Sequence, residues 1–288
     1  MELKHIAVRG GRLSSFLREE MGMSAALVNR LKWQDKLLVN GTAQHTDYQV
    51  QPGDIITALL DAPKPQYPAE SGPLTILYED DHLLAVDKPV GMLIHPSRAT
   101  LTGTLANRIL AHYEKTGQAC AFHPITRLDR DTFGIVLVAK NPHIHALFTQ
   151  QQVENAIEKT YHALVYGCPA EDTGIIDAPI ARRELPSLLR YVNLKTGKPS
   201  LTHYRVVEKR EACSLLALRP ITGRTHQLRV HCAHMGFPIL GDPQYGNQES
   251  KRFSETLGFT SQKLCAKTLS FPHPITGIPM TLTSKLDV

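Results

Sequence analysis

The chain has 288 residues, 42% of them hydrophobic and 20% charged, which are the proportions of an ordinary globular protein. Its 32 basic and 27 acidic residues give a formal net charge of +5, which permits a polyanionic partner but does not require one. No apolar run approaches the length of a membrane-spanning helix, and the amino terminus has no apolar core of signal-peptide length. Neither a membrane anchor nor a secretion signal is therefore expected.

The five cysteines are scattered along the chain and are never spaced as C-x-x-C. Such an odd, unpaired set does not fit a disulfide framework, so reduced thiols and a cytoplasmic location are expected. A group of potential ligands lies at His226, His231, Cys232 and His234, but its spacing is not that of a zinc site. No metal is therefore predicted.

The first sixty residues are predicted to form a small α/β module. Apolar residues recur with helical spacing over 13–21, and Ser24 is placed to cap a second helix. Two strands are then expected at 36–41 and 50–57, each beside a turn that contains glycine.

The order of these elements over 10–60 resembles the S-four-type RNA-binding domain, named for small-subunit ribosomal protein four. Residues 1–65 hold eight basic and seven acidic residues, so net charge does not favour RNA binding there. The basic side chains of the module either contact phosphates or form a solvated helical face. They are Arg12, Arg18, Arg30, Lys32 and Lys36.

The segment 61–73 contains four prolines and is predicted to be a stiff linker. It would separate a domain at 1–60 from a larger one at 74–288. The larger domain is expected to open with a strand hairpin over 74–88 and to continue with alternating helices and strands. We expect helices at 104–113, 143–157 and 225–235, and strands at 159–167, 197–207 and 215–218.

The stretch 124–134 places Asp129 between Arg127 and Arg130, just before an apolar run that is typical of a buried strand. The two guanidinium groups would keep the carboxylate ionised and lower its pKa, which suits a nucleophile or base. By itself, this stretch is more typical of a surface cluster of charges with no function.

Basic residues are concentrated between residues 182 and 229, where eleven Lys or Arg face three Asp or Glu. A solvated face rarely has so one-sided a charge. The segment is therefore predicted to form a basic surface for a polyanion.

Three separated stretches resemble the signature blocks of the RluA-type pseudouridine synthases. They are Asp-Asp-His-Leu-Leu-Ala-Val-Asp-Lys-Pro-Val-Gly at 80–91, Arg-Leu-Asp-Arg-Asp-Thr at 127–132 and Gly-Arg-Thr-His-Gln-Leu-Arg-Val-His at 223–231. Supporting blocks lie at 159–161, 197–204 and 241–246, in the family's order.

The resemblance implies an α+β fold, in which a mixed, largely antiparallel sheet flanked by helices forms the catalytic domain. It implies isomerisation of uridine to pseudouridine in structured RNA without a metal or organic cofactor. By match to the motifs, Asp129 is the catalytic aspartate, Arg229 its partner, and Tyr161 a platform for the target base and a candidate for proton transfer. The residues expected to contact RNA in this domain are Thr126, Arg127, Arg130, Arg224, His226 and Gln227.

These residue types suit the chemistry. The N1–C1′ bond must break and C5 must join C1′, and a base flipped out of a duplex needs an aromatic surface on which to stack. A single ionised carboxylate either attacks the sugar or adds to the base. An arginine opposite Asp129 would hold it ionised, in a pair that is bidentate in its strongest form. A lone carboxylate also argues against glycoside hydrolysis, which uses two.

Two residues depart from the family pattern. Thr126 stands where many members have histidine, and Phe133 stands where they have serine or alanine. Thr126 is expected to bond a phosphate or a neighbouring nucleotide, and Phe133 to fill the core or to act as a wedge against a base. Asp131 is interpreted as structural, and Asp87 and Lys88 as an ion pair beside a bend.

The favoured substrate is large-subunit ribosomal RNA, with transfer RNA second, and a monomer is expected. The competing hypothesis from another class is a catalytically idle RNA-binding or ribosome-assembly factor.

Overall fold

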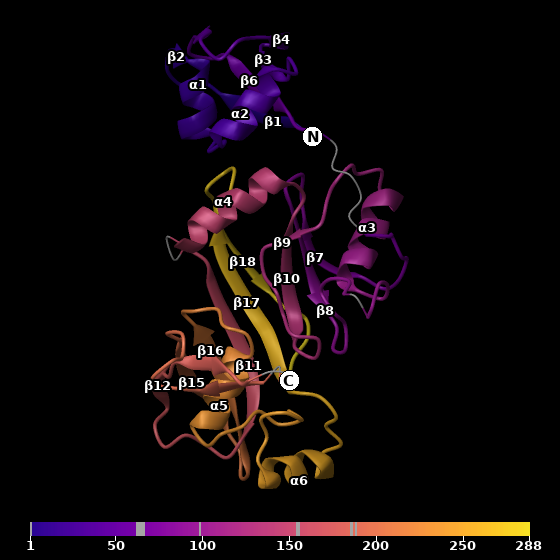
Figure 1. Ribbon diagram of the computed structural model, residues 1–288, viewed down its shortest axis with the longest axis vertical. Helices are drawn as coiled ribbons and strands as arrows, with labels where there is room; N and C mark the ends of the chain where they lie inside the picture. Colours follow the sequence, from indigo (N-terminus) through magenta and orange to yellow (C-terminus); the bar gives the residue numbers. More distant parts are fainter. Residues whose placement is uncertain (1, 62–66, 98, 154–155, 185–186, 188) are drawn as a thin grey trace.

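The computed structural model describes residues 2–61, 67–97, 99–153, 156–184, 187 and 189–288. The amino-terminal module forms one end of the molecule, and a larger body follows it (Figure 1). Within the described ranges, none of the helices combines the length and the apolar character needed to cross a membrane.

The amino-terminal module is built on a four-stranded sheet in the order β1-β6-β3-β4. Its helices follow the predicted spacing, and Ser24 caps α2 as expected, because its hydroxyl accepts a hydrogen bond from Leu27 N at 3.2 Å. Strand β1 was not predicted, and its residues find their antiparallel partners in β6. The elements are β1 (Glu2–Ile6), β2 (Gly11–Arg12), α1 (Leu13–Ser15), the π-helical turn η1 (Phe16–Glu20), α2 (Ala25–Lys32), β3 (Leu37–Val39), β4 (Thr42–Ala43), β5 (Gln49–Val50) and β6 (Ile55–Leu59).

The larger body contains a ten-stranded sheet whose main order is β12-β15-β16-β11-β17-β10-β8-β7. Strands β10 and β17 pair in parallel, and the other pairings in this sheet are antiparallel. The predicted α+β fold with a mixed, largely antiparallel sheet is therefore confirmed. Its strands are β7 (Thr75–Glu79), β8 (Leu83–Lys88), β9 (His123–Pro124), β10 (Phe133–Ala139), β11 (Glu158–Tyr166), β12 (Thr173–Asp177), β15 (Leu201–Lys209), β16 (Cys213–Pro220), β17 (Leu264–Pro272) and β18 (Pro279–Thr283).

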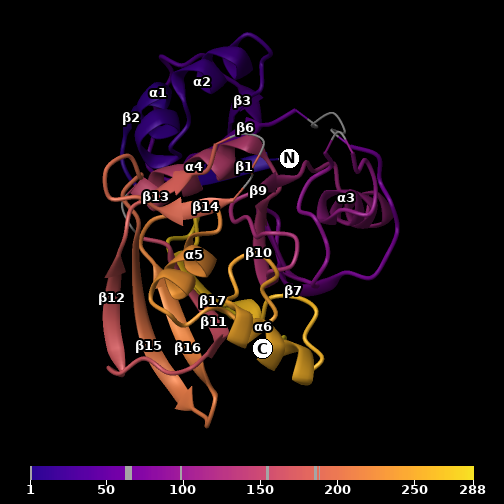
Figure 2. The same cartoon turned by 60° about the horizontal axis from the view of Figure 1, so that its bottom comes forward.

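Helices cover both faces of this sheet, and a two-stranded hairpin lies outside it (Figure 2). The helices predicted at 104–113, 143–157 and 225–235 are present with slightly different bounds. They are α3 (Leu105–Lys115), α4 (Pro142–Val153) and α5 (Gln227–His234), followed by α6 (Gln248–Thr256), and the hairpin consists of β13 (Ile180–Arg182) and β14 (Arg190–Val192).

Strand β10 is buried along its whole length, as its apolar composition predicts. Because successive side chains of a strand point to opposite faces, its residues divide between two hydrophobic clusters. Ile135 and Leu137 join the cluster that includes α4, whereas Val136 and Val138 join the cluster that includes α3. Phe133 is also buried, so of its two proposed roles the structure supports core filling.

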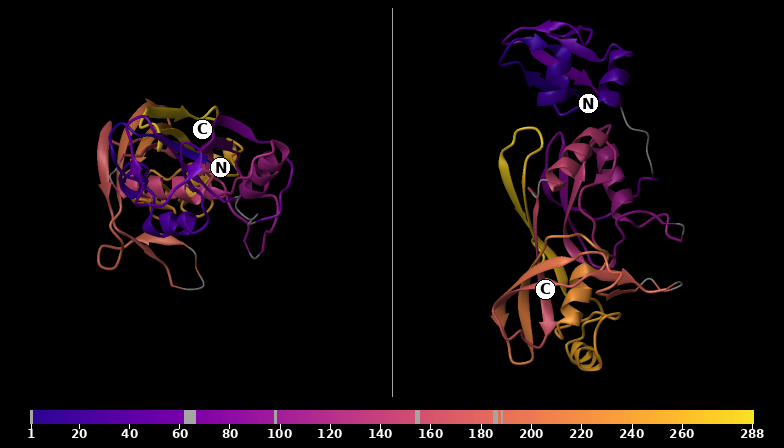
Figure 3. Two further views of the ribbon diagram at one scale, coloured as in Figure 1. Left: turned by 90° about the horizontal axis from the view of Figure 1, so that it is seen from above. Right: turned by 60° about the vertical axis from the view of Figure 1, so that its left-hand side comes forward.

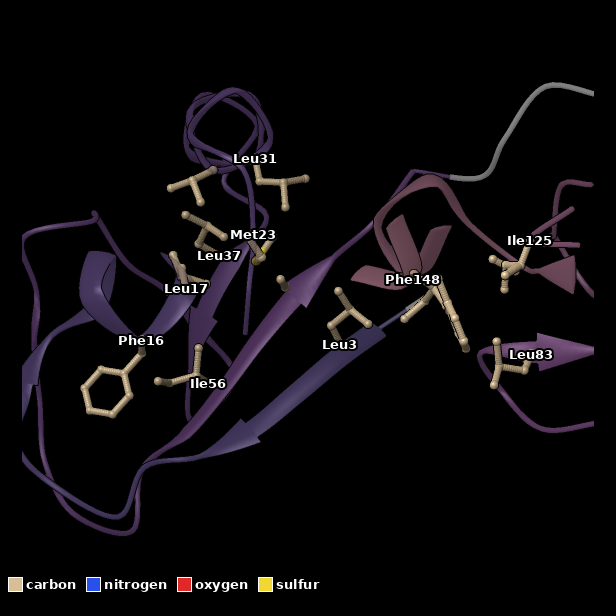
Figure 4. Packing of buried hydrophobic residues seen from close by; sticks show 14 of the residues in the cluster. Leu3, Phe16, Leu17, Met23, Leu31, Leu37, Ile56, Leu83, Ile125 and Phe148 are labelled. Carbon is tan, nitrogen blue, oxygen red and sulfur yellow. The ribbon is translucent and has the colours of Figure 1, made fainter. Parts of the chain in front are cut away.

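The amino-terminal module packs against the larger body through apolar side chains. Leu3 of β1 and Phe148 of α4 belong to one cluster, and Figure 4 shows them at the junction of the two parts. Gly22 approaches Leu147 so closely that an added Cβ would lie 2.6 Å from its Cδ2 atom. Residues 62–66 of the predicted linker lie outside the described residues.

Gly134 permits the parallel pairing of β10 with β17. It has a φ of +104°, and an added Cβ would lie 2.4 Å from the carbonyl oxygen of Ala266. Only glycine combines this backbone conformation with so close an approach. The pairing places β10 next to β17, and β17 in turn lies next to β11.

Candidate active site

Asp129 lies in the loop between β9 and β10, and buried hydrogen bonds fix this loop. The Thr126 hydroxyl accepts from Leu137 N at 2.9 Å, and Gln262 Nε2 donates to Thr132 Oγ1 at 2.8 Å. Thr126 is only 5% exposed. Thr126 was expected to contact RNA, and in this structure its hydroxyl binds the strand behind the loop.

Lys88 holds the same loop from beneath. Its buried ammonium group donates to three backbone carbonyl oxygens at 2.8 to 2.9 Å, one of which belongs to Arg130. Burial lowers the pKa of Lys88 to about 8, although the charges of Asp131 and Asp129 oppose this shift. Lys88 thus places a buried cation next to the Asp129 loop.

The predicted ion pair between Asp87 and Lys88 is wrong. Neighbouring residues of a strand point to opposite faces, so the two side chains diverge. The Asp87 carboxylate instead accepts from Ser284 Oγ at 2.6 Å and from Lys285 N at 2.9 Å. It therefore binds the segment that follows β18 rather than Lys88.

Arg229, on α5, is the partner of Asp129 across 100 residues of sequence, with its Nη1 atom 3.2 Å from Asp129 Oδ2. Its bidentate partner is a different carboxylate, since Nε and Nη2 lie 2.7 and 2.9 Å from the oxygens of Asp242. Gln244 Oε1 also accepts from Nη2 at 2.8 Å. The bidentate pair considered for Asp129 therefore forms with Asp242.

The three charges differ in exposure. The side chains of Arg229 and Asp242 are 5% and 0% exposed, whereas that of Asp129 is 29% exposed. Burial alone would lower the pKa of Arg229, but Asp242 and Asp129 outweigh it and the pKa is raised. The arrangement is a permanently charged guanidinium held from behind, with one accessible carboxylate in front of it.

The arginines next to Asp129 do not hold it. Arg130 Nε and Nη2 lie 3.1 and 3.2 Å from the carboxylate oxygens of Asp131. Arg127 is exposed. The two flanking guanidinium groups were expected to keep Asp129 ionised. Arg130 instead pairs with Asp131, and the arginine in contact with Asp129 is Arg229.

Tyr161 lies on β11, where the pairing with β17 shifts register between Thr160 and Tyr161. Such an irregularity re-aims the side chain that follows it. Tyr161 packs on the cluster that contains Leu228 of α5, on the same face of the sheet as Arg229's helix. Burial raises its pKa to about 12, with a further contribution from the charge of Asp129. The phenol is therefore protonated at neutral pH.

Gln227 was expected to contact RNA, and in this structure its side chain makes hydrogen bonds within the protein. The side chain is buried, and its Oε1 accepts from Thr222 Oγ1 at 2.9 Å and from Arg224 N at 3.0 Å. Its Nε2 donates to Leu201 O and Thr202 Oγ1, both at 3.0 Å. Arg224, by contrast, is exposed.

His226 begins α5 in a left-handed conformation, with φ of +58°. Its Nδ1 atom lies 2.7 Å from the Tyr245 hydroxyl, and its Nε2 atom lies 3.8 Å from Asp129 Oδ2. The Arg229 guanidinium stands 4.9 Å from the centre of the Tyr245 ring. Asp242 and Tyr245 were not predicted as site residues, although the block at 241–246 marked their position.

The predicted RNA contacts of the amino-terminal module lie away from α5 (Figure 1). Arg12 and Arg30 are exposed. The Lys32 ammonium lies 5.4 Å from the ring centre of Trp33, which is 81% exposed. The structure therefore presents these cations to solvent but does not bring them together with Asp129.

The family model described as RNA pseudouridylate synthase matches residues 82–234, which include Asp129, Tyr161 and Arg229. The chain belongs to this family. Membership of this family accounts for both the fold and the sequence motifs. The predicted enzyme class, an RNA pseudouridine synthase that isomerises uridine, is confirmed.

Several relatives support this assignment. The chain is 38% identical to the uncharacterized RNA pseudouridine synthase YlyB of Bacillus subtilis (strain 168), over 92% of this chain and 87% of that protein. It is 37% identical to ribosomal large subunit pseudouridine synthase D of Pseudomonas aeruginosa, over 74% of this chain and 68% of that protein. Among solved structures, human RNA pseudouridylate synthase domain containing 1 superposes with a TM-score of 0.61 at 25% identity, covering 77% of this chain and 93% of that one.

Proposed function

We propose that this pseudouridine synthase modifies large-subunit ribosomal RNA and that Asp129 is its catalytic carboxylate. The observation that carries the site assignment is the contact of Asp129 Oδ2 with Arg229 Nη1 at 3.2 Å, in front of a buried guanidinium–carboxylate pair. Relatives named ribosomal large subunit pseudouridine synthase D, at 36% to 39% identity, favour the ribosomal target over transfer RNA. The five free cysteines fit a cytoplasmic location, and we propose a monomer.

In this proposal Asp129 acts as the nucleophile and Arg229 aims it. Arg229 has no freedom to turn, because Asp242 and Gln244 occupy its other donors. A carboxylate fixed in this way reaches either C1′ of the sugar or the uracil ring once the nucleotide is flipped into the site. Both routes use the same ionised form of Asp129.

Tyr161 is the proposed platform for the flipped uracil. Its ring, with the hydroxyl protonated, lies on the sheet beneath α5. Aromatic side chains commonly stack on unpaired bases. A pKa of about 12 makes a phenolate costly at neutral pH, which favours stacking and hydrogen-bond donation over a role as a strong base.

The RNA is proposed to run over two regions that carry exposed arginines. One is the hairpin β13–β14, which projects from the body (Figure 3) and has exposed Arg182 and Arg183. The other is the amino-terminal module with Arg12 and Arg30. Such contacts are with phosphates, so they position the RNA rather than read its sequence.

Single substitutions test the second region. Arg12→Gln and Arg30→Gln are each expected to weaken RNA binding and to reduce the slope of log Kd against log salt by about one for each phosphate that the variant no longer neutralises. Filter binding between about 50 and 200 mM salt measures both quantities. The matched control is Lys115→Gln, since Lys115 is exposed on α3 and the change removes the same charge. An equal effect of the control would refute the assignment of the module.

The target is tested by tritium release from RNA labelled at uracil C5, with ribosomal and transfer RNA purified separately from cells that lack the gene. Release from the large-subunit ribosomal fraction is expected, because C5 loses its hydrogen when it joins C1′. Release from transfer RNA alone would replace the ribosomal target by the second candidate. Absence of release from every fraction would favour an RNA-binding or assembly factor.

A further inference from the structure

The Tyr245 hydroxyl joins three parts of the site. It accepts a hydrogen bond from Arg190 N of β14 at 2.9 Å, and it lies 2.7 Å from His226 Nδ1 at the start of α5. The face of its ring supports the Arg229 guanidinium at 4.9 Å. One side chain thus contacts the basic hairpin, the partner of Asp129 and a histidine beside Asp129.

These contacts favour one tautomer of His226. The Tyr245 oxygen accepts the Arg190 N–H, and among the described residues His226 Nδ1 is the one group in contact with the hydroxyl that can accept its proton, which makes Nδ1 the acceptor. A neutral imidazole that accepts at Nδ1 has its proton on Nε2. The Nε2–H group therefore faces Asp129 Oδ2, 3.8 Å away.

The surroundings of His226 keep the ring neutral. Burial lowers its pKa, and Arg229 and Arg190 act in the same direction, whereas Asp129 and Asp242 oppose them. The left-handed φ of +58° at His226 costs conformational energy. This backbone conformation sets the direction of the His226 side chain. A separation of 3.8 Å is longer than a hydrogen bond, and such contacts tighten when substrate binds.

We propose that Tyr245 is a positioning residue for the isomerisation: its hydroxyl holds His226 neutral, with Nε2–H directed at Asp129. The carboxylate is then oriented from two sides, by Arg229 and by His226, and Tyr245 contacts both. This inference rests on the proposed catalytic role of Asp129. The bond to Arg190 N also ties the basic hairpin to the same group.

The proposal predicts a specific pH dependence. Protonated His226 cannot accept the Tyr245 proton, and an imidazolium beside Asp129 would make the carboxylate a poorer nucleophile. The rate should therefore fall at acidic pH as His226 gains a proton. Removing the Tyr245 hydroxyl removes a bond that favours the neutral ring, so the acidic limb of the profile should move to higher pH.

The test is single-turnover tritium release between about pH 5 and 8, since this interval brackets the ordinary pKa of histidine. The substrate is total RNA from cells that lack the gene, labelled at uracil C5, at saturating enzyme. Tyr245→Phe is expected to lower the rate at neutral pH about tenfold or more and to move the acidic limb upward by about one pH unit. His226→Gln should abolish the limb, and adding Tyr245→Phe to it should cause no further shift.

The matched control is Tyr113→Phe. Tyr113 is a buried residue of α3, and its hydroxyl has no hydrogen-bond partner among the described residues. It should leave the profile unchanged. A Tyr245→Phe profile that is lowered equally at every pH, or not at all, would overturn the proposal. If Tyr245→Phe is unstable, His226→Gln decides the question, since a retained acidic limb overturns it. Activity in Asp129→Asn would instead refute the proposed function itself.

Discussion

Replacing Asp129 by asparagine is expected to lower the rate of pseudouridine formation by at least about 10³-fold, because the amide is neutral and is not a nucleophile. The size and shape of the side chain are conserved, and a carboxamide oxygen can still accept from Arg229 Nη1, now 3.2 Å from Asp129 Oδ2. The fold should therefore be retained. RNA binding should change little, because the phosphate contacts lie elsewhere.

The measurement is single-turnover tritium release, accompanied by RNA binding and urea unfolding of the same preparation. Asp131→Asn is the matched control, since Asp131 lies two residues away and pairs with Arg130 rather than with Arg229. It should keep most of the activity. Comparable losses in the two variants, or activity that survives in Asp129→Asn, would contradict the assignment of Asp129.

Replacing Asp242 by alanine is expected to reduce the free energy of unfolding by about 3–5 kcal/mol, because it leaves the buried Arg229 charge without its main partner. Arg229 is 5% exposed and makes two bonds to Asp242 at 2.7 and 2.9 Å, so water cannot readily replace the carboxylate. The activity that remains should also fall, because the guanidinium that aims Asp129 would be free to turn.

Urea unfolding measures the first effect, and tritium release from the folded fraction measures the second. Asp172→Ala is the control, since Asp172 is 73% exposed and lies 2.6 Å from Lys209, which is 52% exposed. An exposed pair of this kind contributes about 1 kcal/mol or less. If the two alanine variants unfold at the same urea concentration, the buried network does not stabilise the site as we infer.

Local patterns in the sequence were sufficient for most of the fold. The capping residue Ser24, the apolar run after Gly134 and the helical spacing over 104–113 each depend on residues within one or two turns, and each appears as expected. Strand β1 was not predicted, because only Leu3 of its five residues is buried and because its partner β6 pairs with it from 49 (Ile6 with Ile55) to 57 (Glu2 with Leu59) residues later.

The same distinction holds for the candidate site, whose motif residues could be named from the sequence and whose contacts could not. The residues Asp129 and Arg229 could be named from their match to the family's motifs, and the folded chain places them 3.2 Å apart. The contacts of the neighbouring residues could not be predicted from the sequence. Thr126 and Gln227 were expected to face RNA, but in the structure their side chains form hydrogen bonds with the backbone of Leu137 and Leu201.

Sequence motifs thus determine the family, the fold class and the residues proposed for chemistry, because motifs record which side chains a reaction needs. The partners of those side chains were decided only by tertiary structure. Asp242 lies behind Arg229, and the Tyr245 hydroxyl lies 2.7 Å from His226 Nδ1, because the 241–246 segment contacts α5 directly. Hydrogen bonds and ion pairs act over a few ångströms in space, and no spacing along the chain specifies which distant carboxylate or hydroxyl will occupy that volume.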